Sequence, residues 1–504
     1  MKKVLFCCIF FVSGQVFADW LYDSGAKTFT ECDSAGVPLA DNPWVFATSA
    51  KTEKDSTKIL LTLSKKNIGN SSCLDLQTPI HGADDVVINE LAKDLFYNNS
   101  ASKLVLREVK LPLSLTSIGK RAFMGHTNLV HVTPFIPDGV KYIGLSAFEG
   151  SAITNDLRLG YIEGVTNITL NSNAFYGTKI STVDIGPSIS KIDSKCFQSC
   201  GNLKSVKLSE GLKTIASQAF CYCGALESVI PFFPESVTYL GASSFGQLTA
   251  GYTAITNNLR VGYGGPTTFS STFMNCKFAE ADIGPGVTSI PGKCFQSCPN
   301  LKKVKLPNTL KSIASQGFAF SYALETIEPF LPDSVTSIGA KAFNTEGRGG
   351  LAGELFIGGT TTNNVTIGDS AFHQCAKITS ITYGKGTHTL GQWSVRYIDP
   401  QDIRFLGDIP TFASQAMFNS KNANKELKTR VYIPKDLPGW IDFIAANVTP
   451  WEDVPDAKKE KYYTNFGEGA PTPDGMINNG TLGGMLEQWY FGFSTKTGLL
   501  LLVK

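Results

Sequence analysis

The chain has 504 residues, of which 42% are hydrophobic and 17% are charged, and its formal net charge is +2 at pH 7. The charged fraction is below the usual quarter and the net charge is small. Together they exclude the strongly basic surface of nucleic-acid-binding proteins, so we expect no nucleic-acid partner. The length exceeds what one compact core supports, but a repeat protein escapes this limit because it grows in one dimension.

The first 18 residues have the pattern of a secretory signal peptide. They read MKKVLFCCIFFVSGQVFA: two lysines, a short apolar run, and a small-residue cleavage site before Asp19. The apolar run is too short to span a membrane as a mature helix, and no other stretch approaches 18 consecutive apolar residues. We therefore expect an exported mature chain without a transmembrane segment.

Residues 19–85 lack the repeat that follows them. Trp20, Trp44 and the strand-like segment 58–63 (KILLTL) predict a small β-rich N-terminal cap, which shields the first coil as the ends of repeat stacks require. Cys32 and Cys73 are the only cysteines of this segment. In an oxidising compartment they predict a disulfide.

Residues 86–424 repeat a unit that carries the pattern Ile-x-x-x-Ala-Phe. The segment KCFQSCGNLKSVKLSEGLKTIASQAF, residues 195–220, returns almost unchanged at residues 293–318. The phenylalanines that mark the units are Phe96, in a degenerate first unit, and then Phe123, Phe148, Phe175, Phe197, Phe220, Phe245, Phe273, Phe295, Phe318, Phe343 and Phe372. Intervals of 20 to 29 residues with L-x-x-V-x-L strand segments are the signature of leucine-rich repeats.

One such unit buries too few apolar side chains to offset the entropy lost on ordering its backbone, so only the stacking of neighbouring coils makes the fold stable. The predicted fold class is an α+β repeat protein. It is a mostly β leucine-rich-repeat solenoid with parallel strands and with N- and C-terminal caps.

The phrases SLTSIGKRAFMGHTNL, KTIASQAFCYCGAL and VTSIGAKAFN resemble the BspA-type (treponemal-type) leucine-rich repeats of bacterial surface proteins. The resemblance extends over roughly residues 86–421. It implies a curved, parallel-stranded solenoid that is secreted, periplasmic or displayed on the bacterial cell surface. It also implies a role in adhesion or in binding other proteins.

The C-terminal part divides into two segments. In residues 425–455 a strand is followed by Ile-Pro-Lys and an amphipathic segment, which resembles the unit that closes BspA-like solenoids; residues 441–448 are its expected helix. Residues 456–504 begin as a linker rich in glycine and proline. They end in a pattern, residues 489–503, that predicts two strands around a turn.

Five cysteines lie three residues after a marker phenylalanine, a place that His126, Ser151 and Thr178 take in other coils. They are Cys200, Cys223, Cys276, Cys298 and Cys375. One small polar residue per coil at one angular position predicts a stacked structural column, and the spacing does not match a zinc site. The chain contains no catalytic, nucleotide-binding or metal-binding motif, so we expect neither an enzyme nor a cofactor or metal.

The outward residues of successive predicted strands largely alternate in the sign of their charge. They include Arg158, Asp184, Lys207, Arg260, Asp282, Lys305 and Glu328. Neighbouring opposite charges can pair across the stack and form a solvated ladder. The functional interpretation is a mixed-charge concave surface that docks a protein, since strongly basic or acidic ligands fit such a surface poorly.

Two loop inserts recur along the chain. A Pro-Phe-x-Pro insert carries Phe135, Phe232 and Phe330, and a Leu-Arg-x-Gly-Tyr segment ends at Tyr161 and Tyr263. Phenylalanine rings that fold back would fill their own coil, whereas exposed rings would be aromatic anchors typical of interfaces. The two tyrosines are candidate ligand contacts or simple loop residues.

The sequence thus predicts a non-catalytic recognition or adhesion protein whose partner is an extracellular or surface protein, or a glycan. Two alternatives remain. One is a structural, self-associating component of the cell envelope, with residues 489–503 as the contact. The other is a carbohydrate-binding module that uses Tyr161, Tyr263 and the phenylalanines of the loop inserts.

Overall fold

The computed structural model describes residues 19–40, 44–52, 59–67, 72–78, 80–81, 86–97, 106–246, 254–264, 269–358, 362–386, 388–398, 400–413, 416, 430–434, 436–457, 459–460, 475–477 and 489–493. The predicted signal peptide lies outside the described residues, as does most of the segment 456–504. The chain divides into two compact units, Met1–Ser181 and Thr182–Lys504.

The first unit begins with an antiparallel meander of β1 (Asp19–Asp23), β2 (Thr28–Cys32), β3 (Val45–Thr52) and β4 (Ile59–Asn67). Two further strands pair in parallel with it: β6 (Ile80–His81) with β1, and β7 (Val86–Leu91) with β4. The rings of Trp20 and Phe29 stack with 4.8 Å between centroids, and Trp44 meets Phe96 edge-on at 5.8 Å. Aromatic side chains therefore close the end of the first coil.

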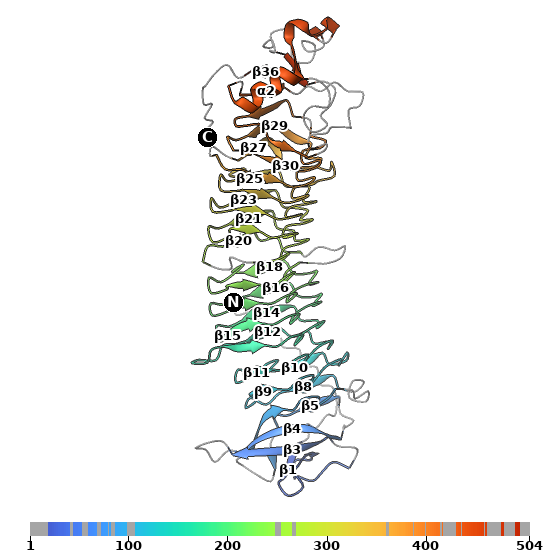
Figure 1. Ribbon diagram of the computed structural model, residues 1–504. Helices are drawn as coiled ribbons and strands as arrows, with labels where there is room; N and C mark the ends of the chain where they lie inside the picture. Colours follow the sequence, from blue (N-terminus) through green and yellow to red (C-terminus); the bar gives the residue numbers. More distant parts are fainter. Residues whose placement is uncertain are drawn as a thin grey trace, which may run out of the picture. The chain divides into compact units, whose positions relative to one another are not determined.

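Each following coil of the first unit adds short parallel strands to two sheets (Figure 1). One sheet continues from β7 through β9 (Ser117–Ile118), β11 (Tyr142–Ile143) and β13 (Ile168–Leu170). The other contains β5 (Cys73–Asp75), β8 (Glu108–Lys110) and β10 (His131–Thr133). The next strand, β12 (Leu157–Leu159), does not pair with β10.

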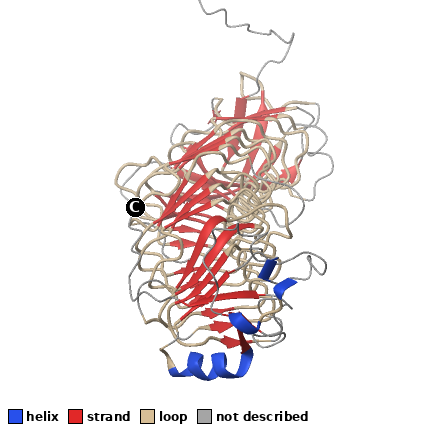
Figure 2. Cartoon of the chain, turned by 90° about the horizontal axis from the view of Figure 1, so that it is seen from above, coloured by secondary structure: helices blue, strands red, loops and turns tan. Residues whose placement is uncertain are grey.

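The second unit continues this arrangement. One face carries two separate sheets. The first contains β14 (Thr182–Ile185), β16 (Ser205–Lys207) and β18 (Ser228–Ile230). The second contains β20 (Leu259–Val261), β21 (Glu280–Ile283), β23 (Lys303–Lys305) and β25 (Thr326–Glu328). On the other face lie β15 (Ile189–Ile192), β17 (Thr214–Ile215) and β19 (Tyr239–Leu240), then β22 (Ser289–Ile290), β24 (Ser312–Ile313), β26 (Ser337–Ile338), β28 (Thr366–Ile367), β30 (Thr389–Leu390) and β32 (Thr411–Phe412). Figure 2 shows that little of the chain is helical. The predicted leucine-rich-repeat solenoid is confirmed.

The last sheet closes the second unit. Its parallel strands are β27 (Ala352–Ile357), β29 (Lys377–Tyr383), β31 (Asp402–Phe405), β33 (Arg430–Ile433) and β36 (Trp489–Phe493), with β35 (Gly475–Ile477) and β34 (Val448–Pro450) added antiparallel. The strand β36 pairs with β33 on one side and with β35 on the other, so neither of its edges is open to a strand of a second copy. This speaks against self-association through residues 489–493 of the predicted contact.

A helix and a 3₁₀ turn accompany this sheet. The helix α2 (Pro438–Asn447) begins three residues before the predicted segment 441–448, because proline is favoured at the first helical position. The 3₁₀ turn η2 (Trp451–Asp453) follows β34.

The marker phenylalanines form the core. In the second unit Phe220 stacks on Phe197 and on Phe245 with 5.2 Å between ring centroids on each side, and all three rings are fully buried. In the first unit Phe96 stacks on Phe123 at 5.1 Å, as expected for a degenerate first coil. One ring per coil explains why the phenylalanine recurs: each ring fills the interior of its coil, and within a run of paired coils it stacks on its neighbours.

The cysteine column is structural, as predicted. The Sγ atoms of Cys223, Cys298 and Cys375 donate to the carbonyl oxygens of the phenylalanines one coil earlier at 3.1–3.2 Å, and Ser321 Oγ makes the same bond at 2.7 Å. All four side chains are buried. Burial raises the pKa of the Cys375 thiol to about 12, so it stays protonated and inert near neutral pH.

The structure contains no disulfide between Cys32 and Cys73, the two residues of the predicted bridge. The two residues belong to different sheets: Cys32 ends β2 in the antiparallel meander, and Cys73 begins β5 beside β8. A disulfide requires that the two Cβ atoms lie close and point toward each other. The spacing of the two cysteines in the sequence does not show whether they do.

His388 makes the fold sensitive to acid. The ring is 1% exposed, its Nε2 atom lies 3.1 Å from the carbonyl oxygen of Gly384, and burial lowers its pKa from the ordinary 6.5. In the unfolded chain the imidazole takes up a proton as the pH falls through 6.5, whereas the folded chain holds it neutral. We therefore expect stability to fall as the pH drops below about 6.5.

The check is the urea midpoint measured between pH 7.5 and pH 5. His388→Gln keeps a donor for the Gly384 carbonyl but cannot titrate, so its midpoint should depend less on pH than that of the wild type. His373→Gln is the control, since His373 is only half-buried. An unchanged pH dependence in His388→Gln would contradict the assignment.

Candidate functional site

The outward residues of five strands in the second unit form one exposed line, which we call the strand-face column. It consists of Ile230 of β18, Arg260 of β20, Asp282 of β21, Lys305 of β23 and Glu328 of β25. Parallel pairing places Arg260, Asp282, Lys305 and Glu328 directly beside one another in that order. These four charged residues of the column are therefore neighbours on one sheet, and Ile230 belongs to the preceding sheet.

The charges of the column pair loosely. Arg260 Nε and Lys305 Nζ each lie 3.9 Å from a carboxylate oxygen of Asp282, so one anion is shared by two cations. Glu328 instead bonds Lys303 at 2.7 Å. Further along the same face, Lys207 Nζ lies 3.5 Å from Asp184. Such exposed pairs add little stability and are screened by salt, so these charges are not needed to hold the fold.

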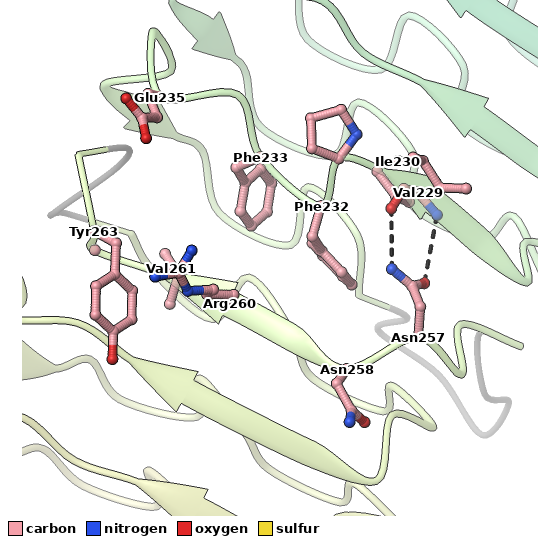
Figure 3. A pocket seen from close by; sticks show the side chains of 12 residues that line it. Val229, Ile230, Phe232, Phe233, Glu235, Asn257, Asn258, Arg260, Val261 and Tyr263 are labelled. Atoms are coloured by element: carbon pink, nitrogen blue, oxygen red, sulfur yellow. Dashed lines mark hydrogen bonds between the residues drawn. The ribbon is translucent and has the colours of Figure 1, made fainter.

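The strand face is interrupted beside Ile230. The strand β18 ends one sheet and β20 begins the next, and the two do not pair. Asn257 spans the break: its Nδ2 donates to the Val229 carbonyl oxygen at 3.0 Å and its Oδ1 accepts from the Val229 N–H at 3.4 Å (Figure 3). One carboxamide thus satisfies both backbone groups of Val229, at the point where a paired strand is missing.

The interruption leaves a groove of about 310 Å³. One wall carries the apolar side chains of Val229, Ile230, Phe232 and Phe233. The other wall carries Asn257, Asn258, Arg260 and Tyr263, with Glu235 at the rim (Figure 3). The volume is at the lower end for ligand pockets, so the groove suits one or two side chains rather than a large cofactor.

The loop-insert phenylalanines point mostly inward, which favours the folded-back alternative over exposed anchors. Phe135 is 7% exposed and Phe232 is 6% exposed, whereas Phe330 is half-buried. The ring of Phe232 lies 6.1 Å from Phe245 and 6.3 Å from Phe273, between centroids. These rings fold back because the insert would otherwise leave the space between two coils unfilled.

The two candidate tyrosines are each covered by an arginine. The guanidinium of Arg260 lies 4.1 Å from the Tyr263 ring centroid, and that of Arg158 lies 3.8 Å from the Tyr161 centroid. The Tyr263 hydroxyl donates to Asp282 at 2.6 Å; burial and this bond raise the pKa of Tyr263. The sequence signal for this cation–π pair was the arginine three residues before each tyrosine, in LRLGY and LRVGY, which the sequence reasoning did not use.

Arg158 belongs to the first unit and does not line the groove. Its Nη1 atom is 3.8 Å from Asp138, and the residue at the place of Ile230 in this earlier coil is Thr133. The insert there buries both Phe135 and Ile136. The first unit therefore repeats the arginine–tyrosine pair without the exposed apolar residue beside it.

The described residues hold no group of three or more His, Cys, Asp or Glu side chains that could bind a metal ion. No helix in the described ranges has the length and apolar character needed to cross a membrane. The strand-face column and the groove offer charge pairing, hydrogen bonds and apolar contact.

The chain is similar to one known family and to several solved structures. The family model for the BspA type leucine rich repeat region matches residues 89–168, 135–250, 267–347 and 359–434. A leucine-rich repeat protein from Bacteroides ovatus is 20% identical, with 79% of this chain and 95% of that chain covered and a TM-score of 0.48. A leucine rich cell surface protein from Faecalibacterium prausnitzii is 20% identical over 89% and 96% of the two chains, with a TM-score of 0.37. The leucine rich repeat protein of T. pallidum is 25% identical over 42% and 88%, with a TM-score of 0.32. No curated protein matches the chain.

Proposed function

Because this chain belongs to the BspA-type leucine-rich repeat family, we propose that it is a non-catalytic recognition protein that acts outside the cytoplasm. Its N-terminal sequence has the pattern of a secretory signal peptide. We place it in the secreted fraction, in the periplasm or on the bacterial surface, where it would bind another protein through its solenoid surface.

The observation that carries this proposal is the strand-face column. Its side chains are largely exposed, with 68% of the Arg260 side chain and 59% of the Lys305 side chain accessible. From Arg260 to Glu328, successive residues stand one strand spacing apart, about 4.8 Å, on hydrogen-bonded parallel strands. A preorganised row of alternating charges beside an apolar residue matches the mixed surface of a folded protein better than a uniformly charged polymer.

A protein partner is favoured over a glycan by the state of the tyrosines. Sugar binding through Tyr161 and Tyr263 requires bare, flat rings, but each ring has an arginine stacked on it. The buried rings of Phe135 and Phe232 offer no platform either. The glycan alternative thus loses most of the residues on which it rested.

The test is capture of extracellular proteins by the immobilised mature chain, residues 19–504, with binding quantified for each captured protein. We expect Lys305→Glu to weaken binding at least about tenfold, because it places a third negative charge beside Asp282 and Glu328. Lys213→Glu is the matched control: it makes the same charge change at an exposed lysine next to β17, on the other face.

Equal binding by the wild type and Lys305→Glu would remove the column as the recognition surface. A wild-type chain that binds an array of glycans and no protein would replace the proposal by the carbohydrate alternative. A chain that captures only itself would favour the structural envelope component.

A further inference from the structure

The groove beside β18 has two chemically different ends. The apolar end is formed by Ile230, whose side chain is 62% exposed, above Phe232 and the half-buried Phe233. Ile230 is among the few large apolar residues exposed to this degree in the described chain. An exposed isoleucine beside a partly filled apolar hollow gains free energy when an apolar side chain covers it.

The polar end is formed by Arg260. Stacking on Tyr263 holds its guanidinium in place, while its contact with Asp282 is 3.9 Å, well beyond the 2.7–2.9 Å of a charge-assisted hydrogen bond. Asp282 also accepts the Tyr263 hydroxyl and faces Lys305. Because Asp282 is shared by Arg260, Lys305 and the Tyr263 hydroxyl, the guanidinium of Arg260 can form a shorter, charge-assisted bond with a carboxylate of a ligand.

Glu235 limits that ligand to one carboxylate. Its side chain lines the rim of the groove and faces Gly264. A Cβ atom built on that glycine would lie 3.5 Å from the Cδ atom of Glu235. A second acidic group would be repelled from this rim. The volume of about 310 Å³ also excludes a bulky polyanion.

We infer that the groove binds an extended protein segment that carries an apolar side chain next to a carboxylate. The apolar side chain covers Ile230 and Phe233, and the carboxylate bonds Arg260. This inference rests on the proposed function and names the local feature of the partner that the second unit recognises. An acidic sugar could satisfy Arg260 but would leave the apolar end uncovered.

The experiment selects a phage-displayed library of random dodecapeptides on the immobilised mature chain. We expect enriched peptides to share an Asp or Glu adjacent to an apolar residue. Synthetic peptides are then titrated by fluorescence polarisation. Changing the acidic residue to its amide, or the apolar residue to serine, should each raise the Kd about tenfold or more.

Variants of the protein give the matching half of the test. Arg260→Ala and Ile230→Ser should each raise the Kd about tenfold or more, and both replace exposed side chains, so their circular dichroism should equal that of the wild type. Arg158→Ala is the internal control: it removes the same arginine–tyrosine pair where Thr133 replaces Ile230. We expect it to bind the peptides with unchanged affinity.

Three results would overturn the inference: no enriched peptide, enriched peptides that bind Arg260→Ala and the wild type equally, or binding of glucuronate in place of the peptides. A captured protein that is lost with Lys305→Glu and kept with Ile230→Ser would also overturn it. That last result would leave the proposed function of the column intact, so the two proposals fail separately.

Discussion

Replacing Phe220 by alanine is expected to lower the stability of the second unit by about 3–5 kcal/mol, the usual loss for removing a fully buried aromatic side chain. The ring stacks on Phe197 and Phe245 and has no exposed area. Its removal leaves a cavity between coils that can close only by bending the backbone hydrogen bonds between them. Because a solenoid is held together by contacts between neighbouring coils, the loss should spread to the adjacent coils.

The measurement is urea denaturation followed by far-UV circular dichroism, with hydrogen exchange to locate the weakened coils. Tyr239→Ala is the matched control: the residue lies in the same region but is 49% exposed, so we expect a change within about 0.5 kcal/mol. If Phe220→Ala unfolds at the same urea concentration as the wild type, the ring is not part of the core and the register of the coils is wrong.

Phe232→Ala should also destabilise the second unit, by about 3 kcal/mol, rather than act on binding alone. The ring is 6% exposed and bridges Phe245 and Phe273, two marker rings on either side of the sheet interruption. Removing it enlarges the groove into the core. We therefore expect a lower urea midpoint together with weaker peptide binding.

Phe330→Ala serves as the control for Phe232→Ala. It occupies the same place in the next Pro-Phe-x-Pro insert, but its ring is half-buried and its neighbour Leu331 is 3% exposed instead. We expect a clearly smaller loss. Equal and negligible effects of the two substitutions would show that Phe232 is a surface residue after all, as the exposed-anchor interpretation of the sequence supposes.

The features that the sequence predicts correctly are those that recur from coil to coil. The phenylalanine at each repeat predicts the stacked rings, since a coil with one inward position per turn must fill it with the same residue type each time. The cysteines three residues later predict the buried column for the same reason. The alternation of Arg260, Asp282, Lys305 and Glu328 predicts neighbouring charges, because parallel strands in register place equivalent residues side by side.

The features that interrupt the repeat were decided by tertiary structure. Whether Phe232 faces the core or the solvent depends on the space that two coils leave between them, and no periodicity describes that space. The bridge from Asn257 to the Val229 backbone exists only because β18 and β20 fail to pair. The same holds for the pairing of β36 with β33, which joins residues far apart in the chain.

A local pattern that is repeated many times thus predicts the solenoid, the register of its coils and the residues that its strands turn outward. The folded chain alone shows where the sheet breaks, which rings fill the break, and that an arginine and an exposed isoleucine line the same groove. These depend on contacts between side chains of different coils, and such contacts are set by packing rather than by the period of the chain.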